Sequence, residues 1–235
     1  MMESQVKDDI FYEIAEARAN FYQFFAGFFL KPPTNNSLQD LKERLETLEL
    51  RETFSDGLVE NMISELAALK DETSRIVQEF HNLFLVPASQ YVTPYESCFR
   101  ETRIKKGKVT KGLLMGKSTR QVVRFYKENG LVVSREFKDL PDHVVLELQL
   151  MGTLCQKEHA AWQKGDRSVA IEALAKEKQF LEEHVLQWVP DLCDEICDKT
   201  SMPLYQGIAR MTREFLEIEQ NTFKEVSFLA AHEKG

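Results

Sequence analysis

Apolar residues recur at helical spacing along most of the chain. In the first segment the pattern runs from Ile10 to Leu30 and stops at Lys31-Pro32-Pro33, where a helix cannot continue. A second helix is expected with Ser37 as its N-cap, and residues 56–86 predict one broken helix or two. A period of about 3.6 residues in every long apolar segment predicts an all-α fold.

The helical pattern is interrupted between Pro87 and about residue 112, where prolines and charged residues predict a long connection. A connection of that length is commonly functional or mobile. Helical spacing returns at Ser118 and ends at Asn129-Gly130, a pair typical of a helix end. The rest of the chain predicts a helical array over 141–164, 167–187, about 190–199 and 203–222.

These elements predict a single all-helical domain of about eight to ten helices over residues 1–235. We expect an N-terminal subregion at about 5–130, a hinge at about 131–143 and a C-terminal subregion at about 144–222. The apolar segment from Phe21 to Leu30 is shorter than the roughly 20 residues that span a bilayer, so a core helix is expected there, with neither a leader nor a membrane anchor.

Composition adds mainly a statement about charge. The low counts of 10 glycines and 7 prolines favour helix over sheet. Acidic residues number 38 against 30 Lys and Arg, a formal net charge of -8. Duplex nucleic acid is therefore not an expected partner, whereas a basic peptide would be attracted. The four cysteines, with no secretory leader, indicate reduced thiols in the cytoplasm.

The stretch Gly112–Ser118 resembles a phosphate-binding loop. Only three residues separate its first glycine from Gly116-Lys117, however, where a phosphate-binding loop has four, and no strand precedes it. The stretch therefore predicts a loop that leads into a helix capped by Ser118.

Cysteine and histidine side chains raise the question of a metal or a nucleophile. Cys193 and Cys197 lie one helical turn apart, with His184 nearby in sequence, but two thiols without a second pair favour buried cysteines over a zinc site. Cys98 has no neighbouring histidine that would support a nucleophile. We therefore expect no metal and no cofactor.

The stretch from Asp139 to His143 combines two carboxylates, a proline and an imidazole directly before an apolar helix. In the structural interpretation Asp139 or Leu140 caps the helix, Pro141 occupies its first turn, and Asp142 interacts favourably with the helix dipole. The alternative is a metal- or nucleotide-dependent enzyme that uses the two carboxylates and His143, with Cys193 and Cys197 as further ligands.

Several motifs together resemble one protein family. Phe80-x-x-Leu83-Phe84, Pro94-Tyr95-Glu96-Ser97 and Pro141-Asp142-His143 occur in the order and approximate separation seen in the TorD/DmsD family of redox-enzyme maturation chaperones. Trp188-Val189-Pro190 and Tyr205-x-Gly207-x-Ala209 are similar as well, so the resemblance covers roughly residues 10–220. The chain departs from many relatives in having Tyr95 in place of a tryptophan, and Cys98-Phe99 after the serine.

The resemblance implies a cytoplasmic chaperone and not an enzyme. Its partners would be the twin-arginine signal peptide and the body of an apo-molybdoenzyme, an anaerobic oxidoreductase of the DMSO or TMAO reductase type. The chaperone would assist cofactor insertion before export, as a monomer or homodimer, without stable insertion into a membrane. Some relatives bind guanine nucleotides weakly, but the spacing of the glycine loop gives no physical support for that here.

Nine residues are expected to bind the peptide. Aromatic and apolar groups would receive its apolar stretch, carboxylates would meet its arginines through charge-assisted hydrogen bonds, and His143 would be a polar anchor or orient a carboxylate. The expected set is Phe84, Pro94, Tyr95, Glu96, Ser97, Asp139, Pro141, Asp142 and His143.

Overall fold

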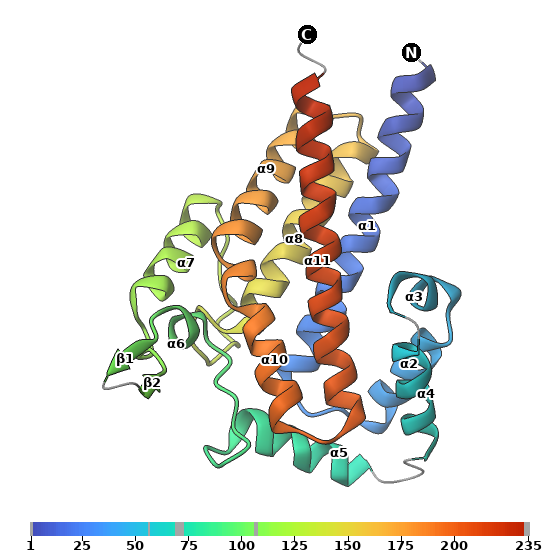
Figure 1. Ribbon diagram of the computed structural model, residues 1–235. Helices are drawn as coiled ribbons and strands as arrows, with labels where there is room; N and C mark the ends of the chain where they lie inside the picture. The colour runs from blue at the N-terminus through green and yellow to red at the C-terminus, as the bar shows by residue number, and fades with distance from the viewer. Residues whose placement is uncertain (1, 56, 69–72, 106–107, 233–235) are drawn as a thin grey trace. The chain divides into compact units, whose positions relative to one another are not determined.

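The computed structural model describes residues 2–55, 57–68, 73–105 and 108–232, and helices form nearly all of its regular structure (Figure 1). The all-α class expected from the sequence is confirmed. Within the described residues the exception is a two-stranded antiparallel hairpin of β1 (Arg103–Lys105) and β2 (Lys108–Thr110).

The chain divides into two compact units, and each unit joins segments that are distant in sequence. The first unit consists of Met1–Gly27 and Tyr95–Trp188, and the second of Phe28–Pro94 and Val189–Gly235. The consecutive subregions expected from the sequence therefore differ from the observed division. The segment expected to be a hinge, about 131–143, lies wholly inside the first unit.

The first unit is built on long helices. It contains most of α1 (Met2–Leu30), then α6 (Glu96–Arg100), the hairpin, α7 (Lys117–Glu128), α8 (Val144–Gln163), α9 (Arg167–Glu183) and the short 3-10 turn η2 (Val185–Gln187). Helix α1 ends directly before Lys31-Pro32-Pro33, as expected. It approaches α8 closely at Gly152, where an added Cβ would lie 3.4 Å from the Ala19 carbonyl oxygen and 3.3 Å from Gln23 Cγ.

A buried ion cluster joins three helices of this unit. The guanidinium of Arg18 in α1 lies 2.9 Å from a carboxylate oxygen of Glu158 in α8 and 2.7 Å from one of Glu177 in α9. The indole Nε1 of Trp162 donates a further hydrogen bond to Glu158, at 2.9 Å. Two carboxylates held around one cation, away from water, cannot lose that cation without a large cost.

The second unit contains α2 (Asn35–Leu45), α3 (Leu48–Thr53), α4 (Leu58–Ala68), α5 (Thr73–Phe80), the π-turn η1 (His81–Leu85), α10 (Val189–Lys199) and α11 (Pro203–His232). In the described part of residues 56–86, where one broken helix or two were expected, the structure has α4, α5 and the π-turn η1. Helix α11 packs on α4, and Gly207 allows this approach because a Cβ there would lie 2.5 Å from Met62 Cγ.

Helix starts differ from expectation by a few residues. The N-cap of α2 is Thr34, and Ser37 is the third helical residue, where its hydroxyl completes a capping box with Thr34. Helix α8 begins at Val144 with the His143 imidazole as N-cap, three residues after the expected start at 141. In both cases the side chain of the observed N-cap residue accepts a hydrogen bond from a backbone amide of the first turn.

The long connection expected between Pro87 and residue 112 is more ordered than its sequence suggests. It includes α6 and both strands of the hairpin. Elements of three to five residues carry too little periodicity to be recognised from one sequence. Among the described residues, none of the helices is both long and apolar enough to cross a membrane.

The Arg18 cluster makes a stability prediction. Arg18→Met should lower the free energy of unfolding by about 3–5 kcal/mol, because it leaves Glu158 and Glu177 buried without their shared cation. Urea denaturation of the full chain measures the change. The control Lys157→Met, at an exposed position of α8, should stay within about 0.5 kcal/mol of the wild type. If Arg18→Met lowers the free energy of unfolding by less than about 1 kcal/mol, Arg18 is not the cation that stabilises Glu158 and Glu177.

Candidate functional site

Two of the segments singled out in the sequence meet in the first unit. Tyr95 and His143 form an isolated antiparallel bridge, and the amide of Glu96 donates a hydrogen bond to the Asp142 carbonyl oxygen at 3.0 Å. The start of α6 and the start of α8 are therefore in direct contact.

The buried carboxylate of Asp142 links the segments that meet here. Its Oδ2 accepts hydrogen bonds from the Ser97 amide at 3.0 Å and from the Thr119 hydroxyl at 2.9 Å. Asp142 and Ser97 are each 0% exposed. Asp142 thus connects the loop before α8 to α6 and to α7, and in this conformation it is closed to a peptide.

His143 is the N-cap of α8 and is 8% exposed, beside the same point. Its Nδ1 accepts a hydrogen bond from the Val145 amide at 3.1 Å, so the proton of the neutral ring lies on Nε2. Burial lowers the pKa of His143 to about 4, although the carboxylates of Asp139 and Asp142 oppose that shift. The imidazole is therefore uncharged near neutral pH.

Asp139 and Tyr95 form the accessible rim of this point. One Asp139 oxygen, Oδ1, accepts hydrogen bonds from the Tyr95 hydroxyl at 2.8 Å and from the Leu140 amide at 2.7 Å. The other, Oδ2, lies 4.0 Å from His143 Nε2, and the side chain of Asp139 is 43% exposed. The ring of His143 meets the edges of Tyr95 and Phe137, with centroids 5.3 and 5.7 Å away.

An apolar groove of about 270 Å³ adjoins this rim. It lies between the loop after α7 and the outer side of α8, and Phe137 belongs both to its wall and to the contact with His143. The groove is lined mainly by aliphatic and aromatic side chains, among them Leu131, Val132, Val133, Leu146 and Leu150. A carboxylate, two aromatic rings and an apolar groove therefore lie next to one another on one unit.

Glu96 lies below this surface in a buried polar network. Its two carboxylate oxygens lie 3.0 and 3.1 Å from Nδ1 of His184, and Arg100 makes an ion pair with it. Burial, followed by the neighbouring Glu96 carboxylate, raises the pKa of Glu147 well above its ordinary value, while Trp188 Nε1 donates to Glu147 at 2.8 Å. Glu96 is 0% exposed and therefore serves the interior of the unit.

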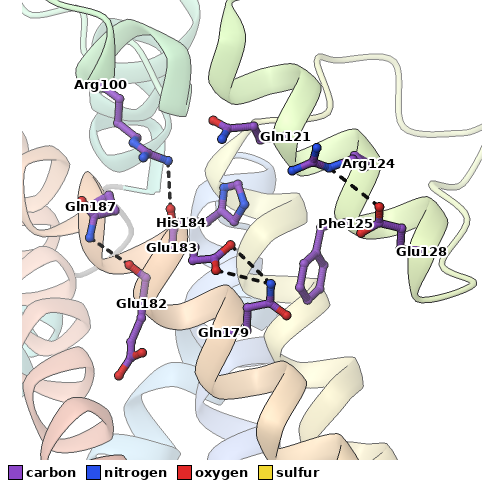
Figure 2. A pocket seen from close by; sticks show the side chains of 10 residues that line it. All are labelled: Arg100, Gln121, Arg124, Phe125, Glu128, Gln179, Glu182, Glu183, His184 and Gln187. Atoms are coloured by element: carbon purple, nitrogen blue, oxygen red, sulfur yellow. Dashed lines mark hydrogen bonds and ion pairs between the residues drawn. The ribbon is translucent and has the colours of Figure 1, made fainter.

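A second cavity, of about 360 Å³, lies between α7 and α9 (Figure 2). Its wall contains basic, acidic and amide side chains, which largely contact one another. Arg124 pairs with Glu128 at 3.8 Å, and Gln179 donates to Glu183 at 3.3 Å. Arg100 donates to the Glu183 carbonyl oxygen at 2.9 Å. Such a mixed wall does not select one class of ligand.

Phe84 and Pro94, two of the nine expected residues, belong to the second unit. Phe84 lies in η1 and is 8% exposed. Its ring packs against Phe80, Phe29 and Tyr205, with centroids 5.1, 5.9 and 6.4 Å away. Pro94 is also buried. Phe84 therefore serves the packing of its own unit.

The glycine stretch before α7 has a structural explanation. Glu101 Oε1 accepts hydrogen bonds from the Ser118 amide at 2.8 Å and the Ser118 hydroxyl at 3.2 Å, so Glu101 fills the position that a phosphate would take. Although burial opposes the shift, the bonds from Ser118 lower the pKa of Glu101. Ser118 is therefore not the cap of α7, and a Cβ at Gly116 would collide with the Glu101 carboxylate.

Neither cysteines nor acidic residues form a metal centre within the part of the chain that the structure describes. Cys193 is 1% exposed, and burial raises the pKa of its thiol. Cys98 is 3% exposed, and burial raises its pKa too, so it is a poor nucleophile. Asp142, a central residue of the enzymatic alternative, is 0% exposed, and its Oδ2 is engaged by Ser97 and Thr119.

Sequence reasoning missed Phe137, Thr119 and Glu147. Phe137 had a usable signal, as an aromatic residue in a polar loop two positions before Asp139. Glu147 also had one, because it interrupts the apolar run that opens α8. Nothing in the sequence distinguishes Thr119 from any helical threonine, since its partner lies 23 residues further along the chain.

Comparison with known proteins gives a consistent family. The family described as nitrate reductase delta subunit matches residues 30–194. The chaperone protein TorD of Vibrio cholerae serotype O1 is 24% identical over 223 residues, covering 90% of this chain and 94% of TorD. The chaperone protein TorD of a Psychrobacter species is 26% identical over 226 residues, covering 90% and 93%.

A solved structure of a candidate redox enzyme maturation protein from Archaeoglobus fulgidus is 20% identical, covers 85% of this chain and 93% of its own, and superimposes with a TM-score of 0.45. The relatives named above are chaperones, in agreement with a non-enzymatic role. Because the family match covers more than half of the chain, the protein belongs to the nitrate reductase delta subunit family, as a TorD-like chaperone of redox-enzyme maturation.

Proposed function

We propose that this chaperone binds the N-terminal twin-arginine signal peptide of a molybdenum-containing client enzyme, in the cytoplasm, before the client is exported. The observation that carries the proposal is the surface where Tyr95, Phe137, Asp139 and His143 adjoin an apolar groove. A leader of this kind has a basic part and an apolar part, and the surface offers a complement to each.

The apolar part of the leader would lie in the groove of about 270 Å³ beside Phe137. Val132, at its margin, is 91% exposed and would lose that exposure on binding. Burying aliphatic and aromatic surface supplies most of the affinity of such an interface, and a few central contacts dominate it.

A leader arginine would meet Asp139. This carboxylate is accessible, and the hydroxyl of Tyr95 and the amide of Leu140 hold its orientation, so little entropy is lost on binding. The neutral imidazole of His143 does not repel a guanidinium. Glu96, Ser97 and Asp142 would act from below, by fixing the segments that carry the rim.

The mechanism is holding and release. An occupied signal peptide would keep an immature client from export, and further contact with the client body would leave it open for insertion of its molybdenum cofactor. No covalent bond is made or broken in this cycle. The chaperone therefore needs only an affinity for the leader that maturation of the client can overcome.

The first test compares two acidic residues of the same loop. Asp139→Asn should weaken binding of a synthetic twin-arginine peptide by about 1–3 kcal/mol, because it removes the charge that meets the guanidinium. Glu136→Gln, three residues earlier and also exposed, is the matched control and should bind like the wild type. Titration calorimetry at two salt concentrations gives both affinities. Equal affinities for Asp139→Asn and the wild type would refute the site.

Asp142 should behave differently from Asp139. Asp142→Ala removes the carboxylate that links α6, α7 and the start of α8, so peptide affinity should fall. The free energy of unfolding should fall as well, by about 2–4 kcal/mol. Asp139→Asn should leave the unfolding transition unchanged, because its side chain is at the rim. Thermal melts followed by circular dichroism separate the two cases, and an Asp142→Ala protein as stable as the wild type would contradict the role of the buried carboxylate.

Peptide binding should not depend on the charge of His143. With a pKa of about 4, its imidazole is neutral at about pH 8 and still neutral at about pH 6, so the affinity should be the same at both. His143→Gln should show the same flat profile. An affinity that rises toward pH 6 in the wild type, but not in His143→Gln, would mean that a charged imidazole takes part.

A further inference from the structure

One segment of this acidic chain is strongly basic. Between residues 100 and 127 lie ten of the chain's 30 Lys and Arg, and only one of its 38 Asp and Glu. This concentration is opposite in sign to the net charge of -8. Leader binding, which calls for carboxylates, makes no use of it.

Helix α7 orders part of this charge on one face. Lys117, Arg120, Arg124 and Lys127 follow one another at intervals of three, four and three residues, so they form a stripe along the helix, in which Arg124 also pairs with Glu128. All four are exposed. The opposite face carries the buried residues of α7, including Val122, Phe125 and Tyr126.

Directly before α7 the chain exposes three consecutive apolar side chains. Leu113 is 70% exposed, Leu114 52% and Met115 63%. We call residues 113–115 the apolar tip. Single exposed apolar residues are ordinary, whereas three consecutive ones directly before a helix with a basic stripe are uncommon.

The tip is held in place from both ends. The amide of Gly112 donates to the Cys98 carbonyl oxygen at 2.8 Å, and a Cβ at this position would collide with the Ser97 carbonyl oxygen. At the other end, Gly116 packs against the Glu101 carboxylate. Met115 has a φ of 60°, a left-handed conformation that non-glycine residues rarely adopt. The fold thus holds these side chains outward at a conformational cost.

We propose that the apolar tip and the basic stripe of α7 together bind the surface of an anionic lipid membrane. Leu113, Leu114 and Met115 would insert among the headgroups, while the lysines and arginines meet the lipid phosphates. Exposed apolar groups beside a cluster of cations are the combination that anchors a protein reversibly at an anionic interface. The contact is peripheral and independent of leader binding.

Lipid fits these observations better than the other anionic partners. Nucleic acid would use the cations, but aliphatic side chains offer no stacking to its bases and no hydrogen bond to its phosphates. An acidic protein would need an apolar recess shaped for the tip. A lipid interface receives aliphatic side chains without such a recess, and it carries its negative charge as a layer.

Co-flotation of the full chain with vesicles tests the proposal. The wild type should bind vesicles of phosphatidylethanolamine and phosphatidylglycerol at low salt, and not vesicles of phosphatidylcholine alone. Leu113→Ser with Leu114→Ser, and separately Arg120→Gln with Lys127→Gln, should each weaken binding by roughly tenfold or more. High salt should weaken binding of the wild type as well.

Matched controls lie outside this face in the same unit. Val169→Ser with Ile171→Ser removes two apolar side chains of α9 that are 47% and 53% exposed, and Lys157→Gln with Lys164→Gln removes two exposed cations. Both control variants should bind like the wild type. If the wild type does not bind anionic vesicles, the proposal fails. If the tip variant binds anionic vesicles as well as the wild type, the apolar tip takes no part in membrane binding and the proposal is wrong.

Discussion

The buried carboxylate of Asp142 is the contact on which the candidate site depends. By accepting hydrogen bonds from the Ser97 amide and the Thr119 hydroxyl, it ties the start of α8 to α6 and α7. The bridge between Tyr95 and His143 follows directly from this attachment, because their neighbours Glu96 and Asp142 are already joined. A buried carboxylate loses its hydration, and the two donors to Oδ2 replace part of it.

The site then separates into a buried support and an accessible rim. Glu96, Ser97 and Asp142 are 0% exposed, whereas Asp139 keeps 43% of its side-chain surface. The buried residues and the rim residues come from the same short motifs, but they have different roles. Buried groups fix geometry, and the rim offers one oriented carboxylate, two aromatic edges and the groove. A protein that must hold a client and later release it benefits from this arrangement, because preorganisation limits the entropy cost of binding without requiring many contacts.

Charge is distributed unevenly along the chain, with a basic segment at 100–127 in an otherwise acidic protein. The same α6 that contributes Ser97 to the Asp142 joint also anchors the glycines on either side of the apolar tip, through Cys98 and the adjoining Glu101. The candidate leader site and the candidate lipid face thus share one short helix as their support. Two surfaces with opposite preferences for charge can coexist in this unit because their accessible residues are different.

The sequence by itself determined the helical class, most helix ends and the two motifs that meet. Helical periodicity is local, so α1 stops at Lys31-Pro32-Pro33 and α7 at Asn129-Gly130, as their residues require. Tertiary structure decided which carboxylates face water: Asp139 and Asp142 lie three residues apart, yet one is accessible and the other buried. It also placed Phe84 in the packing of the second unit and ordered α6 and the hairpin within an expected irregular connection. The partners that settle these outcomes lie tens of residues away, as Ser97 does from Asp142, and no local pattern records such a contact.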